Sequence, residues 1–391
     1  MTTALRDTAP APRLFSRPAV VASCAGFVLI GALQALYGPA LPALRQEHGL
    51  SPSMAGLGLS AHFVGGVAGV LLFDAVHGRI GSRRLLTVSY ALMAVGGGAF
   101  ALAPDWPFAL GAALLTGLGF GGIDYGLNQL FAVGFGDRGA AMLNVLNAHF
   151  GIGAVAGPAL LAALGPGRYA AVFAGCAVLA GVLALSTRGV RAQAPPAAPA
   201  TARPGARGRL VTPVLLGFVA LYVLHVGVEA GVGGWEPTHL ESLGHPAAYA
   251  ASATAVYWLM MTAGRFLVVP IALRYPAPRI LLVCCAGMTG CLALAAVPAL
   301  APYAYAGVGL FIAPLFPTGL PWLARAVPGA RRAGAWVIAA SMVGGVAAPP
   351  ALGKGIEASG VGAVPLLLLL LSAASLAATV WLTRAAGDGD G

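Results

Sequence analysis

Charged residues are scarce in this chain: 9% of its 391 residues are charged, whereas 59% are hydrophobic. Soluble globular domains average about 25% charged and about 45–50% apolar residues. A soluble protein could not hide this much apolar surface, and the mean hydropathy of +0.85 points the same way. The composition therefore excludes an ordinary water-soluble domain and indicates that lipid surrounds most of the chain.

The chain also lacks the alternation of polar and apolar residues that marks a transmembrane β-strand. Its apolar runs are about 20 residues long, which is the length that a helix needs to cross the hydrocarbon core. The pattern predicts an all-α integral membrane protein with twelve transmembrane helices. We expect these helices at residues 18–43, 53–74, 84–103, 108–132, 140–164, 169–186, 212–236, 248–273, 279–299, 302–326, 332–352 and 363–384.

Sequence signatures of enzyme chemistry are missing as well. The five cysteines lie in apolar spans at no metal-ligand spacing. A nucleotide-binding loop is lacking, which disfavours an ATP-driven pump. No set of nucleophile, acid and base supports an enzyme, so we expect neither enzymatic activity nor a bound cofactor.

The net charge of +10 could suit a nucleic-acid partner, but the placement of the basic residues gives another explanation. Most of the 22 basic residues lie in the two tails and in alternate loops, whereas the opposite loops hold Arg45, Arg168 and Lys354. The positive-inside rule then places both termini in the cytoplasm. The first 17 residues lack the apolar core of a secretory signal, so we expect the first helix to direct insertion. The expected location is the cell inner (plasma) membrane, without a nucleic-acid partner.

The longest polar stretch, residues 187–212, is rich in Pro, Ala and Arg and reads as a cytoplasmic linker. It predicts an N-terminal six-helix bundle within residues 1–186 and a C-terminal six-helix bundle within residues 213–391. The two halves repeat each other. An offset of 195 aligns Gly69 with Gly264, and an offset of 192 aligns Gly153 with Gly345.

Two six-helix units in the same orientation are the parallel-repeat plan of secondary transporters, in which the substrate site lies near the bilayer midplane between the halves. Rocking of one half against the other then gives alternating access. A twelve-helix channel or scaffold is the alternative, which the repeat disfavours.

The loop between the second and third spans carries a family motif. Residues 78–84, GRIGSRR, are similar to the acidic-Arg-x-Gly-x-basic-basic signature of the major facilitator superfamily, which the chain resembles over nearly its whole length. The resemblance implies two pseudo-symmetric six-helix bundles and a charged latch between cytoplasmic helix ends. Gly78 stands at the acidic position, and the nearest carboxylate is Asp74 one turn earlier. The expected gating residues are Asp74, Arg79, Arg83, Arg84 and Arg265.

The fourth and fifth spans carry a more specific likeness. Residues 124–128, DYGLN, and residues 143–154, LNVLNAHFGIGA, resemble the fucose/proton symporter family and the related sodium-dependent glucose transporter-like branch. Residues 229–235, EAGVGGW, resemble the second of these. The resemblance implies that Asp124 couples transport to an ion and that neighbouring polar residues contact a sugar. Gly38 stands where the proton symporters have a second acid, which leaves both proton and sodium open as the coupling ion.

Ionisable residues inside the spans support this interpretation. An ionisable side chain at mid-membrane costs at least about 2.5–3.5 kcal/mol, so it needs a partner or a function. Asp124 and Asn128 are one helical turn apart and share a face. A carboxyl group shielded from water can exchange protons near neutral pH, whereas its anion could bind sodium. A hydrogen-bonding hub between helices is the structural alternative. Glu229 is the counterpart in the second half.

Three other ionisable residues have different expected roles. His149 joins a polar ribbon with Asn144 and Asn147, with substrate contact and simple packing as equal alternatives. Arg265 is expected to neutralise a carboxylate or to cap a carbonyl group, because an unpaired guanidinium is too costly. Glu236 precedes Pro237 close to the outer surface, and we expect it to reach water at a solvated helix end.

A sugar site needs an aromatic plate for the apolar face of the ring and amides or carboxylates for the hydroxyl groups. The spans that line the cavity in the resembling family supply both. The candidate substrate-binding residues are Gln34, Tyr37, Asn128, Asn144, Asn147, His149, Trp235, Tyr257 and Trp258, and the candidate ion-coupling residues are Asp124 and Glu229.

The sequence therefore predicts a secondary active transporter that works by alternating access. We expect ion-coupled uptake of a neutral sugar by a monomer embedded in the lipid bilayer. Proton-coupled efflux of a drug or an amphipathic metabolite keeps the fold and is the main alternative. A sensor that has lost transport is the second alternative, although the chain offers no long soluble domain for it.

Overall fold

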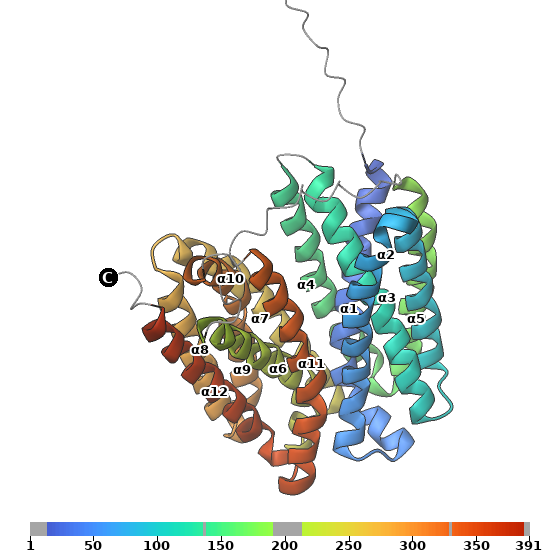
Figure 1. Ribbon diagram of the computed structural model, residues 1–391. Helices are drawn as coiled ribbons and strands as arrows, with labels where there is room; N and C mark the ends of the chain where they lie inside the picture. Colours follow the sequence, from blue (N-terminus) through green and yellow to red (C-terminus); the bar gives the residue numbers. More distant parts are fainter. Residues whose placement is uncertain (1–13, 136–137, 191–212, 328–330, 387–391) are drawn as a thin grey trace, which may run out of the picture.

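The computed structural model describes residues 14–135, 138–190, 213–327 and 331–386 (Figure 1). Apart from one isolated bridge between Phe15 and Val190, its regular structure in these ranges is helical, which confirms the all-α prediction. The long helices are α1 (Arg17–His48), α2 (Pro52–Ala101), α3 (Trp106–Gly134), α4 (Gly139–Leu164), α5 (Tyr169–Ser186), α6 (Pro213–Ser242), α7 (Ala247–Ala272), α8 (Ala277–Leu294), α9 (Ala301–Ile312), α10 (Leu315–Ala326), α11 (Arg331–Ser359) and α12 (Val364–Ala385).

In the described part of the chain, 10 helical segments are long and apolar enough to cross a membrane. One of them, α2, has 50 residues and leaves helical geometry at Gly81, where φ is 71°. The indole Nε1 of Trp106, just after α2, donates to the Met54 carbonyl oxygen near its start at 3.1 Å, so α2 folds back and supplies two spans. Counting α2 twice and adding α11, which has 29 residues, gives the twelve spans that the sequence predicts.

Two corrections concern helix boundaries. The predicted loop between the second and third spans is helical except at Gly81, because a glycine there adopts the positive φ that the sharp reversal needs. The predicted tenth span, residues 302–326, is divided between α9 and α10 around Pro314, which cannot donate a helical hydrogen bond. Helix ends are fixed by local capping, as where Asp105 accepts from the Phe108 amide at 2.9 Å at the start of α3.

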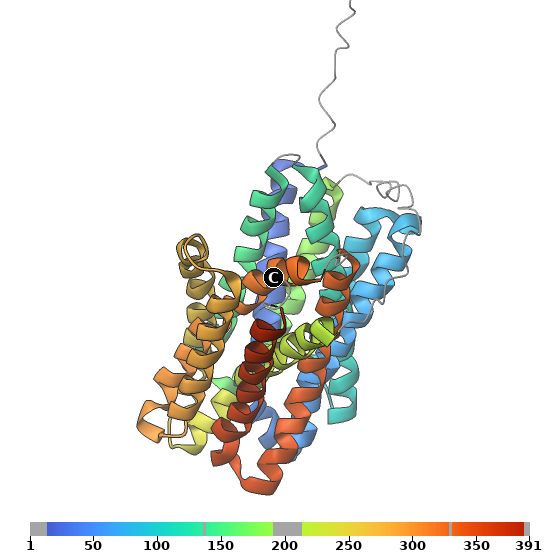
Figure 2. The same cartoon turned by 60° about the vertical axis from the view of Figure 1, so that its left-hand side comes forward.

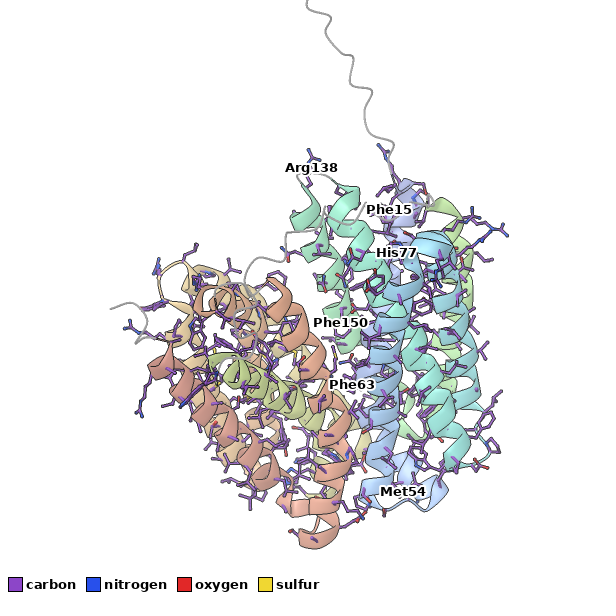
Figure 3. All side chains as sticks on the ribbon, viewed as in Figure 1. Phe15, Met54, Phe63, His77, Arg138 and Phe150 are labelled. Carbon is purple, nitrogen blue, oxygen red and sulfur yellow. The ribbon has the colours of Figure 1, made fainter. Side chains whose placement is uncertain are left out.

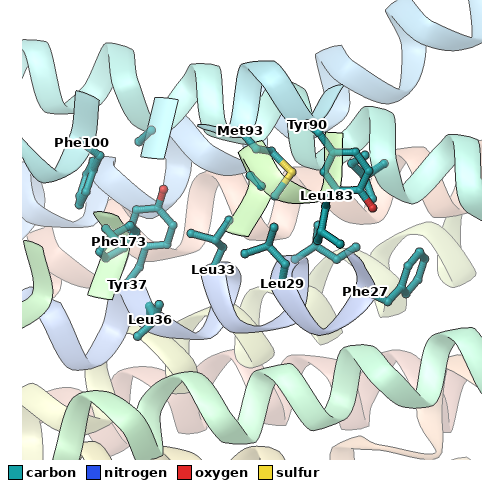
Figure 4. Packing of buried hydrophobic residues seen from close by; sticks show 14 of the residues in the cluster. Phe27, Leu29, Leu33, Leu36, Tyr37, Tyr90, Met93, Phe100, Phe173 and Leu183 are labelled. Atoms are coloured by element: carbon teal, nitrogen blue, oxygen red, sulfur yellow. The ribbon is translucent and has the colours of Figure 1, made fainter. Parts of the chain in front are cut away.

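The helices form two groups, which we call the N-terminal bundle (α1–α5) and the C-terminal bundle (α6–α12) (Figures 1 and 2). Each bundle has its own buried apolar core. In the N-terminal bundle, Leu33 and Tyr37 of α1 pack beside Met93, Phe100 and Phe173 (Figure 4). Most of the predicted linker, residues 187–212, lies outside the described residues, so the exact division of the chain stays a prediction.

Equivalent close contacts occur in the two bundles. Gly153 of α4 lies against the carbonyl group of Val28 on α1, and Gly344 of α11 lies in the same way against the carbonyl group of Val223 on α6. Any side chain at either glycine would meet backbone. The counterpart of Gly153 by contact is therefore Gly344, at an offset of 191, and the predicted pairing with Gly345 at an offset of 192 is wrong by one residue.

The bundles have two exposed ends. The end that carries the described chain ends is called the arginine face, and its loops and helix ends hold Arg79, Arg83, Arg84, Arg138, Arg188, Arg274, Arg279, Arg325 and Arg384. The other end, with Arg45, Arg168 and Lys354, is called the opposite face.

The two bundles touch where the helices approach the opposite face. Near mid-membrane, α1 crosses α6 with Gly38 against the Gly233 carbonyl group. Farther out, the Ser60 hydroxyl group on α2 donates to the Val346 carbonyl oxygen on α11 at 2.6 Å. At the end of α11, the Glu357 carboxylate accepts from the Ser53 amide of α2 at 2.9 Å. These backbone contacts hold the opposite face closed.

Candidate transport cavity

A cavity of about 1820 Å³ lies between the bundles and is lined by residues of both. Its wall includes Tyr275 between α7 and α8, Arg325 near the end of α10 and Thr383 near the end of α12. These residues lie at the arginine face, so the cavity opens there. Phe63 and Phe150 lie on the side of the N-terminal bundle that faces the C-terminal bundle and form part of the wall (Figure 3).

Asp124 of α3 lies on this wall within a chain of amide groups. The Asn128 Nδ2 donates to both the Asp124 carbonyl oxygen and its Oδ1, each at 2.9 Å. The Asn147 Nδ2 of α4 donates to the Asn128 Oδ1 at 3.1 Å. Within the described residues, no Lys, Arg or His lies within ion-pair distance of Asp124. The predicted pair of Asp124 and Asn128 is thus formed, and Asn144 lines the cavity beside it.

Glu229 of α6 lies on the facing wall. The His225 Nε2, one turn nearer the arginine face, is 3.6 Å from the Glu229 Oε2. Arg265 of α7 also lines the cavity and interacts electrostatically with both residues, although it forms no ion pair within 4.0 Å among the described residues. The four-residue spacing of His225 and Glu229 is the sequence signal that places both side chains on one face of α6.

A separate recess of about 10 Å³ lies beside the cavity at the crossing of α1 and α6, and Gln34, Glu229 and Trp258 line it. Gln34 and Glu229 are equivalent under the offset of 195, so the two repeats bring one polar side chain each to the same point. The indole Nε1 of Trp258 is buried and has no hydrogen-bonding partner in the described part of the chain. A buried donor without a partner costs about 1–3 kcal/mol, which a hydrogen-bonding ligand could recover.

Two of the predicted substrate-binding residues lie away from the cavity. Tyr37 is 1% exposed and packs in the N-terminal bundle, with its hydroxyl group 3.3 Å from the His62 Nδ1. Trp235 is 0% exposed, and its Nε1 donates to the Pro349 carbonyl oxygen at 3.0 Å. Trp235 therefore joins α6 to α11 instead of covering a sugar.

Two further candidates bond to the backbone. The Tyr257 hydroxyl group is buried and donates to the Glu229 carbonyl oxygen at 3.4 Å, so it supports the helix that carries Glu229. The His149 Nδ1 is 2.7 Å from the carbonyl oxygen of Val145 on its own helix, and His149 is not part of the cavity wall. Residue spacing placed these side chains in the right helices but could not assign the helix face that meets the cavity.

The predicted gating residues do not form the expected latch. Asp74, Arg79, Arg83 and Arg84 are exposed at the arginine face, and no ion pair joins any of them to another described residue. Asp74 instead interacts with the hydroxyl group of Tyr125 on α3. Arg265 lies on the cavity wall and not at the end of its helix. The cavity separates the described helix ends of the two bundles at the arginine face, which is where the latch was expected.

The model of the Major Facilitator Superfamily matches residues 23–313 of the chain. The chain belongs to the major facilitator superfamily. It is therefore a multi-pass membrane transporter and not an enzyme, as the repeat and the signature loop predicted. The twelve spans and the cavity between the two bundles are the structural features that agree with this membership.

Individual relatives are distant. The arabinose-proton symporter of Bacillus subtilis (strain 168) is 33% identical over 123 residues, which cover 30% of this chain and 26% of that protein. The match thus spans about a quarter of that relative. Among solved structures, a D-xylose-proton symporter has a TM-score of 0.76 at 14% identity, covering 93% of this chain and 96% of that one. The E. coli fucose:proton symporter FucP has a TM-score of 0.61 at 16% identity, with 93% and 98% covered. At such identities the likeness shows the fold alone.

Proposed function

We propose that this transporter takes up a neutral sugar together with a proton, and that Asp124 is the coupling residue. The observation that carries the proposal is the position of Asp124 on the cavity wall, where an amide bonds it and no Lys, Arg or His of the described residues lies within ion-pair distance. A carboxylate so placed is costly at mid-membrane, so it favours the protonated state until water reaches it. Opening of the cavity to one face or the other would therefore change its proton occupancy.

The orientation of Asn128 favours a proton over sodium. Its Nδ2 donates to two oxygens of Asp124, and its Oδ1 accepts from Asn147, so the hydrogen bonds fix which way the amide turns. Sodium would need oxygen ligands around the carboxylate, whereas Asn128 presents N–H groups there.

The recess and the amide chain suit a sugar. Gln34, Asn144 and Glu229 can bond hydroxyl groups, the unpartnered indole N–H of Trp258 adds a donor, and Phe63 can cover an apolar ring face. The relatives named above transport pentoses or a deoxyhexose with protons, which supports the choice of substrate. A drug exporter would not need this number of fixed hydrogen-bonding groups, so efflux is the less supported alternative.

Orientation follows from the charges. Because loops rich in Arg stay in the cytoplasm, we place the arginine face there and the protein in the plasma membrane. The structure is then an inward-facing state. In this mechanism the bundles within residues 1–186 and 213–391 rock as rigid bodies about the crossing at Gly38 and Gly233, and a single chain suffices.

The test is counterflow uptake into proteoliposomes with labelled pentoses, hexoses, deoxyhexoses and disaccharides. Counterflow exchanges sugar without an ion gradient, so it isolates binding and rocking from coupling. We expect one sugar to exchange in the wild type and in Asp124→Asn, and gradient-driven accumulation to be lost only in Asp124→Asn.

The matched control is Asp105→Asn, which changes the other acid of the same helix at an exposed capping position. Because Asn caps a helix about as well as Asp, this variant should accumulate sugar like the wild type. Retained accumulation in Asp124→Asn would refute the coupling role. Absence of exchange for every sugar, together with resistance or dye export in expressing cells, would support the efflux alternative.

A further inference from the structure

A second acidic residue, Glu236, lies inside the C-terminal bundle and has no part in the cavity. It is 0% exposed and stands two turns beyond Glu229 on α6. The sequence predicted a solvated helix end for it, and this is wrong, because α6 continues through Pro237 to Ser242. Glu236 is thus a carboxyl group enclosed by helices, with the opposite face nearer to it than the arginine face.

The described residues around Glu236 offer its carboxyl group no compensating charge. Neither carboxyl oxygen has a hydrogen-bonding partner among the described residues, although the Thr254 hydroxyl group approaches the carboxyl group without meeting hydrogen-bond geometry. No Lys, Arg or His of the described chain lies within 4.0 Å of it. An ionised carboxylate in such a site carries a desolvation cost of several kcal/mol, so the group is held as a neutral acid.

The ionisable groups that face Glu236 are hydroxyl groups and one imidazole. Tyr257 comes from α7 and Tyr305 from α9, and both interact electrostatically with Glu236. The Tyr305 hydroxyl group is 3.0 Å from the Nδ1 of His239, one turn farther along α6. Within the described residues, α1, α11 and α12, which also pack against α6, bring no charged side chain to it.

These groups form a line through the bundle. The Tyr257 hydroxyl group donates to the Glu229 carbonyl oxygen at 3.4 Å and interacts electrostatically with the carboxyl groups of Glu229 and Glu236, so it links the turn of α6 at the cavity wall to the buried acid. Toward the opposite face, His239 is 3% exposed and lies three residues before the end of α6 at Ser242, where it bonds to Tyr305. All of these residues belong to the C-terminal bundle. The contacts that close the opposite face between the two bundles therefore do not separate them.

We propose that Glu236, Tyr305 and His239 form a proton-binding site that exchanges protons with the opposite face and communicates through Tyr257 with Glu229. The proton moves by relay. A hydronium ion gives a proton to one ring nitrogen of His239 and becomes water, and His239 releases the proton of Nδ1 to the Tyr305 oxygen, while the Tyr305 hydroxyl group turns away from His239 and gives its own proton to the Glu236 carboxylate. His239 and Tyr305 remain neutral, and only Glu236 loses its charge.

Proton binding at Glu236 is tested without any substrate. Infrared difference spectra of the purified protein in liposomes, recorded as the pH is raised from neutral to alkaline, report protonated carboxyl groups through their C=O stretching bands. We expect the wild type to lose a carboxyl band that Glu236→Gln lacks entirely. The control Glu241→Gln, which removes a half-buried acid on the same helix, should keep that band.

A relay through the histidine makes a second, independent prediction. In Tyr305→Phe, Glu236 is intact but its link to His239 is cut, so the band should remain while its response to a rapid pH jump at the opposite face slows at least tenfold. This variant also serves if Glu236→Gln does not fold. A wild-type band that persists in Glu236→Gln, or an unchanged response in Tyr305→Phe, would overturn the proposal.

The coupling role of this site depends on the proposed symport, and a transport measurement separates the two. Glu236→Gln should retain counterflow but show a flattened pH dependence of sugar accumulation. If the infrared band titrates and no sugar exchanges, the proton site stands and the sugar proposal fails. If sugar exchanges and accumulates in Glu236→Gln with the wild-type pH dependence, the symport stands and Glu236 is a packing residue.

Discussion

The contact between Gly56 of α2 and Pro349 of α11 allows one prediction to be worked out in magnitude. A Cβ atom at Gly56 would lie 2.6 Å from the Pro349 carbonyl oxygen and 2.8 Å from the Pro350 nitrogen. Real Cβ atoms essentially never approach another heavy atom to less than 3.0 Å, and backbone atoms cannot rotate away. Gly56→Ala therefore forces the two helices apart, at a cost of about 1–3 kcal/mol for overpacking.

This cost falls on one conformation only. The two helices belong to different bundles and meet near the opposite face, so the contact exists while that face is closed and is lost when it opens. A differential cost of about 1–3 kcal/mol shifts a two-state equilibrium by about 5- to 150-fold. Gly56→Ala should move the population by this factor from the state open at the arginine face to the state open at the opposite face.

The assay is the labelling of Ala148→Cys by a membrane-impermeant maleimide in vesicles of either orientation. Ala148 lines the cavity, and the background replaces the native cysteines by serine or alanine. Labelling should slow from the arginine face and accelerate from the opposite face in Gly56→Ala.

Gly111→Ala is the matched control, since Gly111 lies at a similar depth on α3 and a Cβ atom there meets nothing within 4 Å. Replacing Gly by Ala inside a helix also raises helix propensity by about 1 kcal/mol, and Gly111→Ala carries this same gain without the clash. Equal labelling of Gly56→Ala and Gly111→Ala from both faces would refute the reasoning that the α2 and α11 contact is a gate.

Three further predictions follow from individual contacts. Trp258→Phe removes the unpartnered indole donor, and if that donor binds substrate, the KM of uptake should rise about 2- to 10-fold with little change in kcat, from the 0.5–1.5 kcal/mol of one hydrogen bond. Glu357→Gln weakens the bond that α11 makes to the Ser53 amide, so maleimide labelling of Ala148→Cys from the opposite face should increase. Tyr37→Phe leaves the His62 Nδ1 without its partner, so thermal unfolding should show a loss of about 1 kcal/mol while counterflow remains unchanged.

Hydropathy alone predicted the twelve spans, because the length of an apolar run is set directly by bilayer thickness. The pair of Asp124 and Asn128 was also predictable, since four-residue spacing on a helix fixes neighbours whatever the tertiary structure. Arginine placement predicted which loops share a face. All three features depend on local helix geometry or on the membrane. Predicting them does not require knowledge of which helices pack together.

The features that sequence could not predict depend on helix packing. Tyr37 and Trp235 are on helices that line the cavity, but in a chain apolar on all sides the hydrophobic pattern does not say which helix face turns inward. Glu236 looked like a helix end because Pro237 follows it, although a proline can sit inside a membrane helix when neighbouring groups satisfy the backbone. The Gly344 register depends on a one-residue shift between helices that only their contact determines.

Sugar-driven proton movement is the most direct measurement of the central claim. In a weakly buffered suspension of de-energised cells that express the transporter, addition of the sugar found by counterflow should make the medium more alkaline, because each sugar carries a proton inward. Asp124→Asn should abolish this change, and Asp105→Asn should retain it. A wild type that takes up the sugar without any change in medium pH would contradict proton symport.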